Sequence, residues 1–181
     1  MPKVHYFELY GRAEMIRMAL HYLGVEFENV FHAGEDWAAF KPETPFGQMP
    51  CLELDDGTML GQSVACVEYV ARKWGDNKEG FNPTDALQVY NGVANSNLIN
   101  EDWLMKHLMK AWFMPDGEEK TKALENAIGV EYPKTMALLE KRVPAEGFLS
   151  GPNLSKYDIY FSGFWLNIVR SPAPKNQEMV D

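Results

Sequence analysis

The chain has 181 residues, of which 46% are hydrophobic and 13% aromatic, and a formal net charge of −9. This apolar content is enough to build a core and excludes a disordered chain, while the negative charge argues against nucleic acids and anionic membranes as general partners. The sequence has no run of ~20 apolar residues that could span a membrane and no N-terminal signal pattern.

The first thirty residues predict a β-α-β unit. Residues 3–7 are rich in β-branched and aromatic side chains, which favours a strand. A helical face follows, with Glu14, Arg17 and His21 expected on the opposite, polar side. The residues of the apolar face are Ala13, Ile16, Leu20 and Leu23. Gly24 suits the end of this helix, and residues 25–30 predict a second strand parallel to the first.

Residues 31–63 predict a short helix near Trp37 and then a hairpin that leads into another helix. Met49-Pro50 begins the hairpin and can form a cis bond, and Asp56-Gly57 indicates a two-residue primed turn. Ser63 stands where an N-cap belongs, ahead of a helix that ends near residue 75. The whole order of elements is that of a thioredoxin-like domain.

The rest of the chain predicts only helices. Residues 76–83 carry loop chemistry and no apolar period, so we expect a linker there. Helices are predicted over 84–113, where asparagines interrupt the apolar face, over 118–142, kinked or divided at Pro133, and over 156–169. Ser155 begins the last helix as a capping box, and Pro172 and Pro174 end it. We therefore expect two domains, 1–75 and 84–181.

Several candidate binding residues fall on one edge of the predicted first domain. Tyr6, at the end of the first strand, is suited to donating a hydrogen bond to a thiolate, or it is a strand tyrosine with its ring in the core. Gln62 and Ser63 open a helix and suit an anion, or they form an ordinary cap. Trp37 and Lys41 either hold a carboxylate or are a packed indole beside a solvated lysine.

Cysteines and histidines give no sign of a metal or disulfide site. Cys51 and Cys66 form no CxxC pair and have apolar neighbours, so we expect buried, inert thiols in a reducing cytoplasm. The four histidines have no ligand-like spacing, and we expect no metal. A thioredoxin-type disulfide reductase is disfavoured because no cysteine lies at the first turn.

A set of spaced motifs resembles the cytosolic glutathione S-transferases, most of all the sigma class with its prostaglandin D synthases and S-crystallins. The motifs are YFELYGRAE (6–14), DW (36–37), KP (41–42), PFGQMP (45–50) and QS (62–63). The resemblance implies a thioredoxin-like α/β domain that binds glutathione, followed by an all-helical domain, in a cytoplasmic homodimer.

The resemblance also implies a role for each matching residue. Tyr6 would activate the glutathione thiol, and Gln62 and Ser63 would hold the γ-glutamyl carboxylate. The Met49 backbone, before a cis Pro50, would pair with the cysteinyl backbone. The remaining glutathione contacts would come from Phe7, Arg12, Trp37, Lys41 and Gln48. A pocket for a small hydrophobic electrophile would be lined by Leu9, Tyr10 and Trp103.

Two departures from the family pattern bear on function. Asn97 stands nearest to the place where the family puts an acidic residue that reaches the partner subunit's glutathione. The helical domain is also expected to be shorter than in the family. The leading hypothesis is a transferase that conjugates glutathione, with no metal. The alternatives are a non-catalytic, S-crystallin-like or ligand-binding homologue and a glutathione-dependent isomerase.

Overall fold

The structure, a computed structural model, describes residues 1–169, and side chains up to residue 163. The chain forms two compact units. Residues 1–82 belong to the first unit and residues 83–161 to the second, and the described residues from 162 group with the first. The break after Asn82 lies inside the predicted linker, whereas the grouping from residue 162 was not expected. The predicted stops at Pro172 and Pro174 lie outside the described residues.

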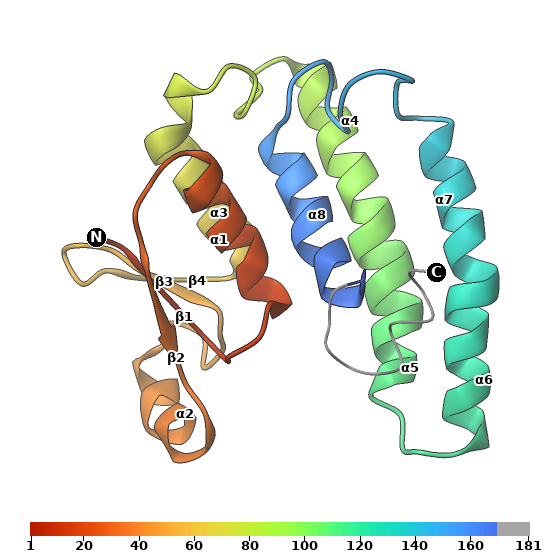
Figure 1. Cartoon of the computed structure of the whole chain (residues 1–181), viewed down its shortest axis with the longest axis horizontal. Helices are drawn as coiled ribbons and strands as arrows, with labels where there is room; N and C mark the ends of the chain where they lie inside the picture. The colour runs from red at the N-terminus through yellow and green to blue at the C-terminus, as the bar shows by residue number, and fades with distance from the viewer. Residues whose placement is uncertain (170–181) are drawn as a thin grey trace. The chain divides into compact units, whose positions relative to one another are not determined.

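The first unit is built on a four-stranded mixed sheet with the order β2-β1-β3-β4 (Figure 1). Its strands are β1 (Lys3–Tyr6), β2 (Glu28–Phe31), β3 (Cys51–Glu53) and β4 (Met59–Gly61). β1 pairs in parallel with β2, as the β-α-β pattern predicts, and antiparallel with β3. β2 begins three residues later than predicted. The central strand, β1, therefore ends at Tyr6 with a partner on each side.

Two helices cover one face of this sheet, α1 (Glu14–Tyr22) and α3 (Ser63–Trp74). Figure 1 shows them together on one side. The apolar side chains that α1 and α3 bury contribute to the core of the unit; they include Met15, Ile16, Leu20, Val67 and Val70. The polar side of α1 is not fully solvated, because the side chains of Arg17 and Glu14 are only 12% and 16% exposed.

A third helix, α2 (Gly34–Phe40), lies at the other face and buries none of its residues. It is held by stacked rings, with the Phe40 ring centroid 4.1 Å from that of His32 and 4.7 Å from that of His5. The His5 ring also forms hydrogen bonds, between its Nδ1 and Nε2 of His32 at 3.0 Å and between its Nε2 and the carboxylate of Glu53 at 2.8 Å. Burial, and secondly the neighbouring His5, lower the pKa of His32.

The hairpin between β3 and β4 differs in detail from the prediction. The N–H of Gly57 donates to the carbonyl of Leu54, and among the described residues of the turn only Gly57 has a positive φ, at 83°. A two-residue primed turn would need positive φ at Asp56 as well. The connection is instead a three-residue loop, Asp55 to Gly57, closed by a glycine in the left-handed region.

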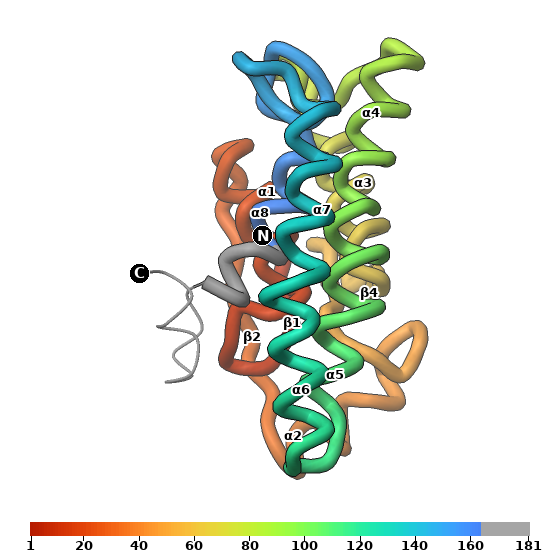
Figure 2. The backbone as a smooth tube through the Cα atoms, turned by 90° about the vertical axis from the view of Figure 1, so that its right-hand side faces the viewer, coloured from red at the N-terminus to blue at the C-terminus, as the bar shows by residue number. Residues whose placement is uncertain are grey.

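The second unit contains two long helical runs that lie side by side (Figures 1 and 2). The first run is α4 (Ala86–Asn97), a π-helical segment (Leu98–Met109) and α5 (Lys110–Trp112). The second is α6 (Glu118–Asn126), a π-helical segment (Ala127–Glu131) and α7 (Tyr132–Glu140). α8 (Lys156–Val169) follows. None of the helices in the described part of the chain is both long and apolar enough to cross a membrane.

The asparagines of the first run do not interrupt its buried face as predicted; two of them form part of it. Asn95 is 1% exposed, donates to the carbonyl of Leu149 at 2.9 Å and accepts from Arg142 at 2.9 Å. Asn100 is 8% exposed and donates to the carbonyl of Tyr160. Buried polar groups need such partners, which the sequence spacing does not show.

The remaining helix boundaries agree with the prediction. The second run changes from α to π geometry at Ala127 and returns to α geometry at Tyr132, directly before Pro133. The boundary of α7 therefore falls where the proline, which lacks the N–H needed to continue the ladder, predicts a kink or a division. Asp158 accepts hydrogen bonds from the N–H and the hydroxyl of Ser155, each at 2.8 Å, so the capping box is confirmed.

Candidate functional site

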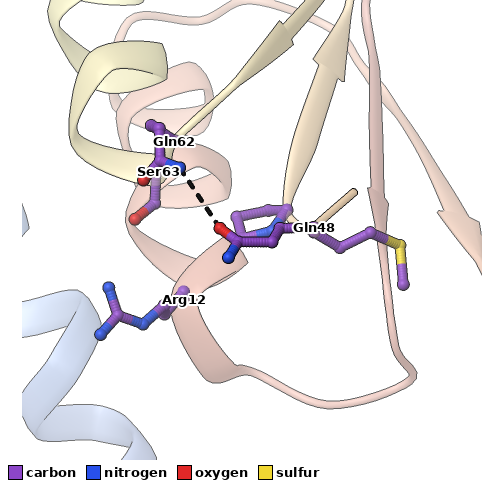
Figure 3. Close-up of a pocket in the computed structure, with 6 residues that line it drawn as sticks. Arg12, Gln48, Gln62 and Ser63 are labelled. Carbon is purple, nitrogen blue, oxygen red and sulfur yellow. Dashed lines mark hydrogen bonds between the residues drawn. The ribbon is translucent and has the colours of Figure 1, made fainter. Parts of the chain in front are cut away.

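A pocket of about 380 Å³ opens at one edge of the first unit (Figure 3). Six residues line it, and all six were predicted to bind a ligand: Arg12, Gln48, Met49, Pro50, Gln62 and Ser63. They come from the turn after β1, the loop before β3 and the start of α3. The topology of the sheet therefore brings together residues as far apart in the chain as Arg12 and Ser63.

Backbone geometry shapes the two ends of this pocket. The Met49-Pro50 bond is cis, as the family resemblance implied. Gln62 has φ 68° and ψ 109° and stands at the N-cap position, so Ser63 is the first residue of α3 and not its cap. A positive φ at a residue other than glycine is uncommon and tends to occur at functional sites. It turns the chain sharply from β4 into the helix and leaves Ser63 4% exposed.

Side-chain hydrogen bonds connect the loops around the pocket. The Gln62 amide donates to the Gln48 amide oxygen at 3.3 Å, from the start of α3 to the loop before β3 (Figure 3). The Thr44 hydroxyl accepts from the N–H of Gln48 at 3.1 Å and donates to the carbonyl of Lys41 at 2.8 Å. Thr44, which the sequence analysis did not single out, thus connects two predicted site residues, Lys41 and Gln48.

Tyr6 lies beside this pocket at the end of β1. Its side chain is 9% exposed, and its hydroxyl oxygen accepts a hydrogen bond from the backbone N–H of Arg12 at 3.2 Å. Gly11 makes this possible. A Cβ at Gly11 would lie 2.3 Å from Cε1 and 2.5 Å from the hydroxyl oxygen of Tyr6. With its φ of +46°, Gly11 satisfies two demands that only glycine meets easily.

The other predicted residues lie outside the pocket lining. Phe7 and the half-buried Trp37 meet edge to face, with ring centroids 5.9 Å apart. Lys41, Leu9 and Tyr10 are exposed. Among the described residues, no contact brings these side chains into the pocket itself, so their roles stay predictions.

Trp103 belongs to the interior of the second unit. Its side chain is 2% exposed, its indole N–H donates to the carbonyl of Ala127 at 2.8 Å, and its ring lies 4.9 Å from that of Tyr132. These contacts explain its burial through packing within its own unit. These contacts do not test its predicted place in an electrophile pocket, which stays a prediction.

The two cysteines are buried, as predicted. Burial raises the pKa of Cys51 to about 11 and that of Cys66 to about 12. Cys51 follows Pro50 directly, but its thiol donates to the carbonyl of Gln48 at 3.2 Å and is not ionised near neutral pH. Among the residues that the structure describes, no group of three or more His, Cys, Asp or Glu side chains is arranged to hold a metal ion.

The arrangement suits a small peptide-like anion. The start of α3 carries the positive end of the helix dipole, which favours a carboxylate. Amide side chains of Gln48 and Gln62 offer donors and acceptors, and Arg12 is the charged residue of the six that line the pocket. Tyr6 supplies a hydroxyl nearby.

Comparison with known proteins identifies relatives over most of the chain. The family model described as "Glutathione S-transferase, N-terminal domain" matches residues 2–72. Glutathione S-transferase 1 of Ascaris suum is 34% identical over 170 residues, which cover 92% of this chain and 75% of the relative. Hematopoietic prostaglandin D synthase of Gallus gallus is 29% identical over 159 residues, 88% of this chain and 75% of the relative.

Solved structures share the fold. A prostaglandin D synthase of Nilaparvata lugens superposes with a TM-score of 0.79 at 27% identity, over 99% of this chain and 88% of the other. A glutathione S-transferase of Ascaris lumbricoides gives a TM-score of 0.72 at 25% identity, over 99% of this chain and 91% of the other. The predicted architecture, a thioredoxin-like domain followed by a helical one, is confirmed.

Proposed function

Because the chain belongs to the glutathione S-transferase family, we propose that it binds glutathione in the pocket beside Tyr6 and uses the Tyr6 hydroxyl to stabilise the glutathione thiolate. The thiolate then attacks an electrophilic carbon of a small apolar compound and forms a C–S bond, while the leaving group departs with the electron pair of the bond that breaks. The observation that carries this proposal is the position of Tyr6, held by the N–H of Arg12 next to a pocket built for a peptide-like anion.

The two ends of glutathione differ in charge and would meet different parts of the site. The γ-glutamyl carboxylate would lie at Gln62 and Ser63, where the first turn of α3 favours negative charge. The cysteinyl backbone would pair with the Met49 backbone as an added strand. The glycyl carboxylate would lie toward Gln48, with Trp37 and Lys41 completing that end. This orientation places the thiol between the cis-proline loop and Tyr6.

The hydrogen bond from Arg12 fixes how Tyr6 can act. A phenol has one proton, and its oxygen already accepts from the Arg12 N–H. The proton therefore remains available to donate to a thiolate, and a hydroxyl that accepts one hydrogen bond donates a stronger one. Lowering the thiol pKa by about two from its ordinary value near 8.5 corresponds to about 2.7 kcal/mol. A charge-assisted hydrogen bond of this kind supplies about 1.5–3 kcal/mol.

The proposal has further parts that follow the family. The protein would form a homodimer in the cytoplasm and would use no metal. Leu9, Tyr10 and Trp103 would line the electrophile site. Phe7, which packs on Trp37, would connect Tyr6 to the glycyl end of the site.

A glutathione-dependent isomerase of the prostaglandin D synthase type is a second candidate. It is favoured by one observation, the likeness of both the sequence and the structure to proteins named prostaglandin D synthase. Conjugation consumes one glutathione for each product, whereas isomerisation returns it. Measuring thiol consumption during turnover of each substrate class separates the two reactions.

The ultraviolet absorbance of bound thiolate tests the proposal. The absorbance of the thiolate of bound glutathione is followed from about pH 5 to 9, in the unmodified protein and in Tyr6→Phe. Glutathione binding is measured separately by tryptophan fluorescence. We expect a bound-thiol pKa about two below that of free glutathione, and we expect Tyr6→Phe to bind glutathione but to lose this shift. Binding without a shift in the unmodified protein would refute activation by Tyr6 and favour the non-catalytic reading.

A further inference from the structure

The guanidinium of Arg17, on α1, makes four hydrogen bonds in a largely buried position. Nη1 donates to the backbone carbonyls of Leu9 at 3.0 Å and Tyr10 at 3.3 Å. It also donates to the Glu14 carboxylate at 3.1 Å. Nε donates to the Asn29 side-chain oxygen on β2 at 2.7 Å. One side chain thus ties the turn after β1 to both α1 and β2.

The two carbonyls that Arg17 holds come just before the residues that contact Tyr6. The Tyr10 carbonyl belongs to the peptide that leads into Gly11, and Gly11 lies against the Tyr6 ring. The next residue, Arg12, donates its N–H to the Tyr6 hydroxyl. Because a peptide unit is planar, fixing the Tyr10 carbonyl also fixes the direction in which the chain enters Gly11 and Arg12.

Stability alone is a weak explanation for this arginine. Its side chain is 12% exposed, and its Nη2 atom is buried without a hydrogen-bond partner among the described residues. A buried charged group that is only partly satisfied is costly, and a buried ion pair such as that of Arg17 with Glu14 is weak evidence of net stabilisation, although removing one partner alone destabilises the fold. The planar fork of arginine is suited instead to fixing the direction of several acceptors at once.

We propose that Arg17 is a positioning residue for thiol activation: it holds the Leu9–Tyr10 turn so that the Arg12 N–H meets the Tyr6 oxygen. The proposal rests on the proposed function of Tyr6. It predicts that loss of the guanidinium weakens activation through Tyr6 even though Arg17 makes no contact with the reacting thiol.

The test compares bound-thiol pKa values in a double-mutant cycle. The variants are Arg17→Met, Tyr6→Phe and the two combined, each saturated with glutathione. Arg72→Met is the matched control, because Arg72 is 74% exposed and its ion pair to Glu68 is 3.7 Å long. We expect Arg17→Met to raise the bound-thiol pKa by about one, a tenfold loss of thiolate at low pH, and Arg72→Met to leave it unchanged.

The combined variant decides whether Arg17 acts through Tyr6. In the Tyr6→Phe background, Arg17→Met should add no further change in the thiol pKa. Two results overturn the role of Arg17 and leave the proposed function intact. One is an additive change of the thiol pKa in the combined variant. The other is a bound-thiol pKa in Arg17→Met equal to that of the unmodified protein, while Tyr6→Phe loses the shift. If Tyr6→Phe itself changes nothing, the proposed function is what fails.

A milder variant covers the case in which Arg17→Met does not fold. Asn29→Ala removes only the acceptor for Nε and leaves the two carbonyl bonds in place. We expect the bound-thiol pKa to rise by a smaller amount, and again only when Tyr6 is present. An unchanged thiol pKa in a folded Asn29→Ala protein, with Arg17→Met unable to fold, would count Arg17 as structural only and overturn the proposal.

Discussion

The contact between Gly11 and Tyr6 gives the sharpest prediction, the effect of Gly11→Ala. The new methyl carbon would lie 2.3 Å from Cε1 of Tyr6, whereas carbon atoms in contact lie about 3.5–4.0 Å apart. The ring or the turn must therefore move by about 1 Å, and a displacement of that size at a catalytic group can lower the rate about 100-fold. The left-handed φ of +46° adds a cost of about 1–2 kcal/mol to the folded state.

Gly57→Ala is the matched control. Its φ is +83°, and nothing lies within 4 Å of an added Cβ. In urea titrations Gly57→Ala should lower the free energy of unfolding by about 1–2 kcal/mol, and Gly11→Ala by more, because its clash with Tyr6 adds to the same backbone cost. Only Gly11→Ala should lower kcat/KM for conjugation to a model electrophile, by about 100-fold. The reasoning is refuted if Gly11→Ala keeps a kcat/KM within about twofold of the Gly57→Ala value.

Three further predictions concern pH, the thiols and the capping box. Burial and then the neighbouring imidazole lower the pKa of His32 from 6.5, so the unfolded chain binds that proton more readily and the free energy of unfolding falls as pH drops below about 6.5. Urea titrations should show that His32→Gln removes this part of the slope; an unchanged slope contradicts it. With pKa values of about 11 and 12, Cys51 and Cys66 should resist iodoacetamide at about pH 8 until the protein is denatured, as counted by mass spectrometry. Asp158→Ala removes an acceptor of three hydrogen bonds of 2.8 Å and should lower the free energy of unfolding by about 2–4 kcal/mol, against about zero for the exposed Asp116→Ala.

Local patterns in the sequence predicted most of the fold. The β-α-β opening, the hairpin that leads into α3 and the division of the second helical run near Pro133 all appear in the structure. These features depend on residues close together in the chain, such as the spacing of apolar side chains and the position of proline. The motif resemblance to the glutathione S-transferases is confirmed by the relatives.

The errors arose where the deciding partner is far away in the sequence or where backbone angles decide. Asn95 looked like an interruption because its partner, the Leu149 carbonyl, is 54 residues away. Ser63 looked like a cap because serine often is one, but the positive φ of Gln62 moved the helix start by one residue. The proposed role of Arg17 could not be predicted from the sequence, because its guanidinium binds two backbone carbonyls, which residues of any type can provide.

The two sides of the candidate site should differ in how readily their amide protons exchange with solvent. Tyr6 ends the interior strand β1, which pairs with β2 and β3, so the amides of β1 should exchange only when the whole unit unfolds. α2, which precedes Lys41 and carries Trp37, buries none of its residues and is held mainly by the ring stack on Phe40. Its amides should exchange through local opening, and a ligand that binds across both sides would slow exchange in α2 far more than in β1.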